Sequence, residues 1–137
     1  MCTGCVLVVD DDPALTTLLK EALEDQGYEV CPAAAAAAPL VAREMQPDVI
    51  LLDYAMPGMD GAHISRHLRG DPRTAAIPIV LMSGHAPTAR PRLPVDEELS
   101  KPFDLDALFA TVACWSAVRS GYGYGYGYGY GRCRGVA

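Results

Sequence analysis

The residues best suited to chemistry in this chain stand where short apolar runs end. The candidates are Asp10, Asp11 and Asp12 after the run at 6–9, Asp53 after residues 49–52, Ser83 after residues 79–82, and Lys101 after residues 99–100. Three carboxylates that meet at one place repel one another unless a cation compensates their charge. Carboxylate and carbonyl oxygens suit Mg²⁺, so Asp10, Asp11 and Asp53 are the candidate metal ligands.

Ser83 and Lys101 extend this chemistry from metal binding to phosphoryl transfer. A hydroxyl and a fixed positive charge are the groups needed to hold the remaining oxygens of a phosphoryl group attached to a carboxylate. Together with the acidic residues they predict an aspartyl-phosphate site, in which one carboxylate attacks phosphorus. We expect Asp53 to be this nucleophile, because it stands alone on the middle run of the set.

The elements that must position these residues are predicted from hydrophobic periodicity. The runs at 6–9, 49–53 and 77–83 read as buried strands, and a short strand is expected at 28–31. Helical patterns lie between them at 13–26, after the alanine-rich stretch up to 45, at 62–68 and at 103–118. Alternating strands and helices indicate an α/β domain with a parallel sheet, whose ligands bind at the carboxyl ends of the strands.

Two acidic residues have a structural interpretation of their own. Asp12 directly precedes Pro13 and is expected to cap the first helix, and Asp60-Gly61 is expected to form a turn and a cap. The whole triplet at 10–12, taken alone, is equally compatible with a cap cluster. Between Ser83 and Lys101 the prolines at 87, 91 and 94 predict that any helix is short or irregular.

Length and composition further limit the functions that the chain can have. A chain of 137 residues, half of them hydrophobic, fits one domain with its own core. We expect a cytoplasmic protein, since no apolar run could cross a bilayer and no signal sequence is evident. The net charge of −6 disfavours direct DNA binding. Cys2 and Cys5 have half of a zinc-site spacing but no second pair follows, so we assign no metal to the cysteines.

The last part of the chain has a different composition. Residues 121–131 alternate Gly and Tyr, which would give a strand with one face of glycine only, at high entropic cost. We expect residues 120–137 to be a low-complexity tail without fixed structure, which leaves weak RNA binding or self-association open.

Four stretches together resemble a known family. VLVVDDDP at 6–13, PDVILLDYAMPGMDG at 47–61, IPIVLMSG at 77–84 and LSKPF at 99–103 are similar to the receiver domains of two-component response regulators. The resemblance covers about residues 5–119 and implies a receiver domain over 1–119. It implies the flavodoxin-like (βα)5 fold with strand order 2-1-3-4-5, in this chain with a shortened or irregular fourth helix.

The resemblance also implies roles for individual residues. Asp10 and Asp11 correspond to the acidic Mg²⁺ pair, Asp53 to the phosphoacceptor, Ser83 to the switch hydroxyl and Lys101 to the family's lysine, with a metal ligand from the backbone carbonyl of Ala55. The Lys101-Pro102 peptide is expected to be cis. The implied protein is no enzyme beyond its own phosphotransfer and dephosphorylation. It takes phosphate from a histidine kinase or phosphotransfer protein and signals by protein contact, as a monomer or weak dimer without a further output domain.

Two positions depart from or qualify the family pattern. The family usually has an aromatic residue three positions before the lysine, whereas this chain has Glu98. His85, two residues past Ser83, takes a place that in receivers lies near the phosphoryl group. We therefore expect phosphorylation to be retained while the signal leaves by another face or by reordering of residues 85–98.

Two alternative functions remain open from the sequence. A pseudo-receiver or truncated regulator would act as a binding module without phosphorylation. A phosphohydrolase of the haloacid dehalogenase type would use Asp10 and Asp12 as an Asp-x-Asp pair, but Asp53 would then have no role.

Overall fold

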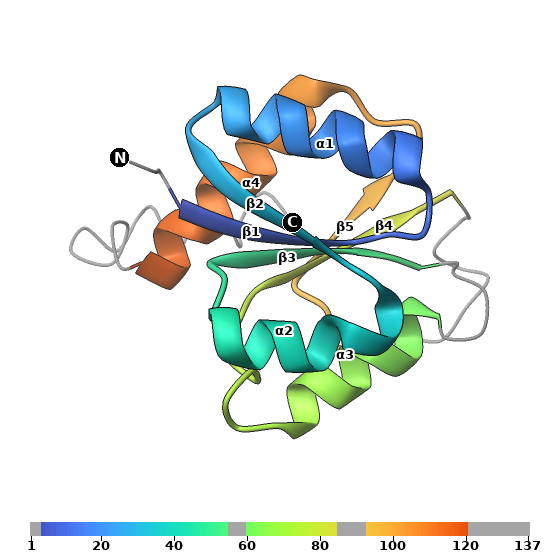
Figure 1. Cartoon of the computed structure of the whole chain (residues 1–137), viewed down its shortest axis with the longest axis vertical. Helices are drawn as coiled ribbons and strands as arrows, with labels where there is room; N and C mark the ends of the chain where they lie inside the picture. The colour runs from blue at the N-terminus through green and yellow to red at the C-terminus, as the bar shows by residue number, and fades with distance from the viewer. Residues whose placement is uncertain (1–3, 55–59, 85–92, 121–137) are drawn as a thin grey trace.

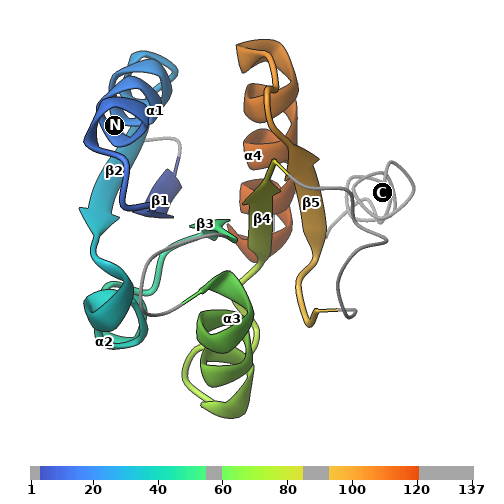
Figure 2. The ribbon, with the colours of Figure 1, turned by 90° about the vertical axis from the view of Figure 1, so that its right-hand side faces the viewer.

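The apolar runs form strands of one sheet in the computed structural model, which describes residues 4–54, 60–84 and 93–120. The strands are β1 (Gly4–Val9), β2 (Tyr28–Ala33), β3 (Val49–Asp53), β4 (Ile79–Ser83) and β5 (Glu97–Ser100). All pairings are parallel, and the order is β2-β1-β3-β4-β5, as predicted. β1 and β3 lie in the interior of the sheet, whereas β2 and β5 are its edges (Figures 1 and 2).

The register brings the ends of the strands to one edge of the sheet. Val9 pairs with Leu52, and the next residues of these two strands along the chain are Asp10 and Asp53. On the other side, Asp53 pairs with Met82, and Ser83 pairs with Ser100. Because parallel strands all point the same way, each polar residue that follows a strand reaches the same rim.

Helices cover both faces of the sheet. They are α1 (Pro13–Asp25), α2 (Ala38–Met45), α3 (Gly61–Gly70) and α4 (Leu105–Ser120), with a short 3₁₀ turn η1 (Ala35–Ala37) before α2. α1 and α4 lie on one face and α2 and α3 on the other (Figure 1). Alternate residues of the interior strands supply the two cores: Val6 and Leu51 pack toward α1 and α4, whereas Leu7 and Ile50 pack toward α2 and α3. This alternation is the period of a strand buried on both faces.

The two predicted helix caps are confirmed. The Asp12 side chain accepts hydrogen bonds from the backbone N–H groups of Ala14 (3.0 Å) and Leu15 (3.4 Å). Asp60 accepts one from the N–H of His63 at 3.0 Å. α1 ends before Gly27, whose φ of 98° lies in the left-handed region that favours glycine.

Some expectations need adjustment and others lie outside the described residues. β2 extends two residues beyond the predicted 28–31, through Pro32 and Ala33, which an edge strand tolerates. The described residues contain four α-helices, and the last, expected at 103–118, runs from Leu105 to Ser120. Ser120 therefore belongs to α4, and the rest of the tail expected at 120–137 lies outside the described ranges, as does most of the expected irregular helix after Ser83, on residues 85–92. Within those ranges, no helix has the length and apolar character needed to cross a membrane.

Candidate functional site

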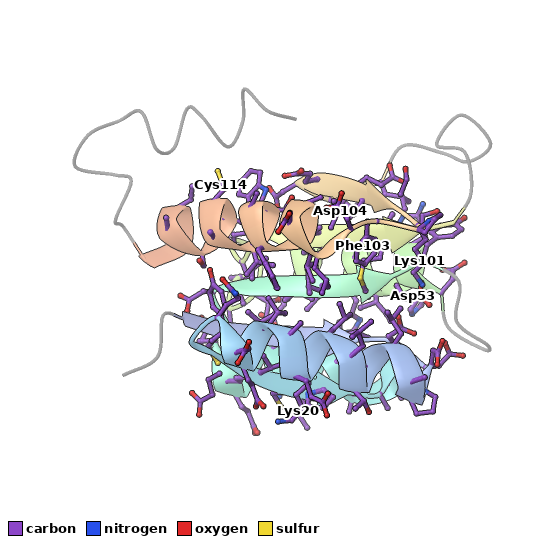
Figure 3. All side chains as sticks on the ribbon, turned by 90° about the horizontal axis from the view of Figure 1, so that it is seen from above. Lys20, Asp53, Lys101, Phe103, Asp104 and Cys114 are labelled. Atoms are coloured by element: carbon purple, nitrogen blue, oxygen red, sulfur yellow. The ribbon has the colours of Figure 1, made fainter. Side chains whose placement is uncertain are left out.

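Lys101 and Asp53 meet at the carboxyl edge of the sheet. Asp53, the last residue of β3, is 5% exposed, and its Oδ1 accepts a hydrogen bond from Lys101 Nζ at 2.9 Å. Figure 3 shows the two side chains together at this end of the molecule. Lys101 reaches this place because it follows β5 directly, with its N–H donated to Ser83 O at 2.7 Å, and the Lys101-Pro102 peptide is cis as expected. The site therefore contains a buried carboxylate already held by a cation.

Two more carboxylates join this pair. Ligand oxygens of Asp10, Asp11 and Asp53 all lie within 4.8 Å of one another. Lys101 Nζ is 3.7 Å from Asp10 Oδ2, so one ammonium group faces two carboxylates. The expected convergence of acidic residues from β1 and β3 is thus present, and one lysine charge is too little to balance three ionised groups.

The surroundings of Asp10 fit a bound cation. Asp10 Oδ1 accepts a hydrogen bond from the N–H of Asp12 at 2.9 Å, while no hydrogen bond from the described residues reaches its buried Oδ2. Burial raises the pKa of the Asp10 carboxyl group, and the nearby charge of Asp53 raises it further, against the lowering effects of the Asp12 N–H and Lys101. A hard divalent ion such as Mg²⁺ binds carboxylate oxygens of this kind: one is buried without a hydrogen bond from the described part of the chain, and two other carboxylates lie beside it.

Ser83 lies at the same rim on the neighbouring strand. It is the last residue of β4, is 2% exposed, and stands one position beyond Met82, the residue that pairs with Asp53. The sheet therefore brings Asp10, Asp11, Asp53 and Lys101 into one cluster and sets Ser83 on the adjacent strand end. The proposed ligand Ala55 and the neighbouring His85 lie outside the described residues.

Gly61 belongs to the site in a way that the sequence did not predict. A Cβ atom at this position would lie 2.6 Å from the carbonyl oxygen of Asp53 and 2.9 Å from Tyr54 Cα. The Gly61 N–H donates a hydrogen bond to Tyr54 O at 2.7 Å. The first turn of α3 therefore lies directly against the end of β3. The Asp60-Gly61 pair indicated a turn and a cap, but a contact between backbones that are seven residues apart has no periodic signal.

Known proteins resemble this chain over most of its length. The family model of the response regulator receiver domain matches residues 6–113. The DNA-binding dual master transcriptional regulator RpaA of Synechocystis is 34% identical over 113 residues, which cover 78% of this chain and 46% of that protein. The response regulator PleD of Caulobacter vibrioides is 46% identical over 80 residues, covering 57% of this chain and 17% of PleD. The chain spans about half the length of RpaA and of the DNA-binding response regulator MtrA of Mycolicibacterium smegmatis.

Solved structures give the same picture. The receiver domain of a sensor histidine kinase from Pseudomonas aeruginosa, with a magnesium ion coordinated in its active-site cleft, superimposes with a TM-score of 0.76 at 25% identity, covering 83% of this chain and 98% of that one. The chemotaxis response regulator CheY4 of Vibrio cholerae gives 0.74 at 28% identity, covering 82% and 98%. The fold, the site and these matches lead to one conclusion: the chain belongs to the response regulator receiver domain family of two-component signal transduction.

Proposed function

We propose that this receiver domain accepts a phosphoryl group on Asp53 in a Mg²⁺-dependent reaction. Phosphorylation on an aspartate and use of Mg²⁺ are general features of the family. The observation that supports the proposal for this chain is the 2.9 Å contact between Lys101 Nζ and the buried Asp53 Oδ1, beside the oxygens of Asp10 and Asp11. A lysine and a metal site on the two sides of one carboxylate favour attack on phosphorus by that carboxylate, because both neutralise charge during transfer.

The proposed phosphoryl donor is a phosphohistidine. A carboxylate oxygen of Asp53 forms a bond to phosphorus while the bond from phosphorus to the donor's imidazole nitrogen breaks. The leaving nitrogen keeps the electron pair and takes a proton from solvent. Lys101 and the Ser83 hydroxyl would then hold phosphoryl oxygens by charge-assisted hydrogen bonds.

Asp10, Asp11 and Asp53 would hold the Mg²⁺, with Ala55 as the proposed backbone ligand. When bound, the ion supplies positive charge to the transferring group and orients its oxygens. The described residues fit this role because they donate no hydrogen bond to the buried Asp10 Oδ2, and because oxygens of Asp10, Asp11 and Asp53 lie within 4.8 Å of one another.

A groove beside the site suits the docking of a phosphodonor protein. It has a volume of about 440 Å³ and is mostly apolar, with the following lining residues: Leu15, Leu18, Leu19, Lys101, Pro102, Phe103 and Leu105. Leu18 and Leu105 are 49% and 37% exposed, which is high for leucine. Because Lys101 belongs both to the groove and to the site, a helical phosphohistidine protein bound there would stand next to Asp53. We propose a histidine kinase or a phosphotransfer protein as this partner.

The output is proposed to be contact with another protein. We take residues 1–119 as the receiver unit and residues 120–137 as a tail, and we propose that this unit itself does not bind DNA, since the chain carries a net charge of −6. RpaA and MtrA are DNA-binding proteins by name, but this chain matches less than half of each.

The first test is intact-mass spectrometry after incubation with Mg²⁺ and acetyl phosphate. We expect one phosphoryl group on the native chain, none on Asp53→Asn, and none in EDTA. Asp104→Asn is the control, because it removes a carboxylate that caps α4 and is not one of the three clustered acids. An adduct on Asp53→Asn would contradict the proposal. If the native chain takes neither phosphate nor beryllofluoride, the phosphorylation-independent binding module is the better description.

The second test addresses the partner. Leu18→Glu places a charge in the groove without touching the carboxylates, so phosphorylation by acetyl phosphate is expected to continue. Transfer from a histidine-phosphorylated phosphotransfer protein that is active on the native chain is expected to slow by about tenfold or more. Equal rates for the native and Leu18→Glu chains with the protein donor would place its docking elsewhere.

A further inference from the structure

Arg69, in the last turn of α3, connects segments that are distant in the sequence. Its Nε donates to Pro94 O at 3.0 Å, and one terminal nitrogen donates to Ala75 O and Ile77 O, both at 2.8 Å. The other terminal nitrogen forms an ion pair with Asp96 Oδ2. One guanidinium group thus joins the connection before β4 to the residues just before β5.

The same carboxylate continues the connection into the sheet. Asp96 Oδ2 also accepts the backbone N–H of Ile79, the first residue of β4, at 2.8 Å, and the Asp96 N–H donates to Ile79 O at 2.9 Å. Arg69 and Asp96 together therefore fix the start of β5 against the start of β4. This cluster lies at the amino ends of β4 and β5, whereas Asp53 lies at the carboxyl ends of the strands. It is therefore outside the site described above.

The position matters because β5 is short and lies at the edge of the sheet. Among the strands that the structure describes, this four-residue strand pairs with β4 alone. On its helix side, Glu97 accepts hydrogen bonds from Trp115 Nε1 at 2.6 Å and from Thr111 Oγ1 at 3.4 Å in α4. Lys101 follows the strand directly, so a shift at Asp96 is carried about 16 Å along an extended segment to the lysine backbone.

We propose that Arg69 is a positioning residue for the phosphorylation reaction: it fixes the start of β5 and thereby sets where β5 delivers the Lys101 ammonium group between Asp53 and Asp10. The inference rests on the proposed function, because only there does the place of Lys101 matter chemically. Arg69 is suited to this role because a planar guanidinium has several donors in a fixed arrangement, which a lysine cannot replace.

The proposal predicts that Mg²⁺ affinity rises, whereas a simple loosening of the structure would lower it. The Lys101 ammonium group lies 2.9 Å from Asp53 Oδ1 and 3.7 Å from Asp10 Oδ2, so it competes with a divalent cation for these oxygens. Removing the ammonium group by Lys101→Ala is expected to tighten Mg²⁺ binding by about tenfold. Displacing it through Arg69 is expected to tighten binding as well, by about threefold. A general loss of structure would weaken Mg²⁺ binding instead.

The experiment is a double-mutant cycle on the whole chain. Arg69→Lys, Arg69→Gln, Lys101→Ala and the two double variants are titrated with Mg²⁺ by calorimetry, and their rates of phosphorylation by acetyl phosphate are compared. Arg69→Lys keeps the charge, so a shared effect of both Arg69 variants excludes a long-range charge effect. Leu68→Ala is the structural control, since it opens a cavity in the same helix and Leu68 has no polar side chain to hold β5. Far-UV circular dichroism establishes that each variant is folded.

The expected signature is tighter Mg²⁺ binding with slower phosphorylation for both Arg69 variants, and little further change in Mg²⁺ affinity when Lys101→Ala is already present. Unchanged or weaker Mg²⁺ binding in the Arg69 variants would overturn the inference, and so would equal effects with and without Lys101→Ala. Failure of the proposed function is distinguishable, because the native chain itself would then not be phosphorylated.

Discussion

The site has an acidic side, with Asp10 and Asp53, and a lysine side, with Lys101, and different forces hold the two sides in place. Asp10 follows β1 and Asp53 ends β3, two of the interior strands, and the residues before these carboxylates are buried on both faces by helices. Lys101 follows β5, an edge strand with one buried residue, Leu99. Apolar packing fixes the acidic side, whereas the lysine side depends on polar anchors at Arg69, Asp96 and Glu97. Interior strands thus need little beyond hydrophobic burial, while an edge strand needs individual side-chain contacts to reach the same precision.

Substitutions that remove a core side chain from β3 or from β5 test this difference directly. Leu51 in β3 is fully buried, and Leu51→Ala is expected to lower the free energy of unfolding by about 4 kcal/mol, because the lost side chain leaves a cavity between sheet and helices. Leu99→Ala in β5 removes the same atoms from a less enclosed place and is expected to cost about 2 kcal/mol. Urea denaturation followed by circular dichroism measures both. Equal losses would show that apolar packing holds the two strands equally well.

Gly61 provides a second test, on the acidic side of the site. Gly61→Ala would place a Cβ 2.6 Å from Asp53 O, so the start of α3 or the end of β3 must move, at a cost of about 1–3 kcal/mol. We also expect slower phosphorylation, since the displaced backbone carries Asp53. Gly70→Ala is the matched control, because its Cβ meets nothing within 4 Å at the other end of the same helix. A Gly61→Ala chain as stable and as readily phosphorylated as Gly70→Ala would show that the contact is not restrictive.

Trp115 tests a polar anchor of the lysine side. Trp115→Phe keeps most of the buried ring but removes the Nε1–H that Glu97 accepts at 2.6 Å, and we expect a loss of about 1–2 kcal/mol. The double variant with Glu97→Gln measures how much of this loss belongs to the pair. Because Trp115 is the only tryptophan, unfolding is best followed by far-UV circular dichroism. Strictly additive effects of the two substitutions would mean that the hydrogen bond between Trp115 and Glu97 does not stabilise the position of β5.

A weaker effect is expected for the pH dependence of stability at an exposed contact. The backbone N–H of Arg73, and then its side chain, hold the pKa of the Asp71 carboxyl group below its usual value of 3.8. A lowered folded-state pKa means that this carboxylate stabilises the fold above the unfolded-state pKa and loses that contribution as the pH falls through the folded-state pKa. The stability of the native chain should therefore exceed that of Asp71→Asn at pH 7, and the difference should vanish in strong acid. A difference that persists at pH 2 would point to another cause.

Much of the fold could be predicted from the sequence, for physical reasons that differ between elements. Interior strands are apolar without interruption, and Pro13, Gly27 and the capping Asp12 mark helix ends through local chemistry, so these features can be recognised in a short window of sequence. The cluster of Asp10, Asp11, Asp53 and Lys101 follows from the topology, because parallel strands bring their carboxyl ends to one rim.

The features that sequence reasoning missed are contacts over long sequence separations. Nothing near Arg69 indicates that it bonds Pro94 and Asp96, and nothing near Glu97 indicates Trp115 as its donor. Such polar pairs depend on tertiary geometry and leave no periodic pattern. The roles of Ser83, Ala55 and the Glu98 position in signalling remain predictions.

The edges of the sheet also affect how the protein meets copies of itself. Pro32 is exposed in β2 and has no N–H group, so a further strand added at that edge would find its ladder of hydrogen bonds interrupted. At the opposite edge, β5 has only four residues, which leaves a short ladder for a further strand. Both margins of the sheet are thus poor templates for strand addition, which protects the folded domain from edge-to-edge aggregation at high concentration.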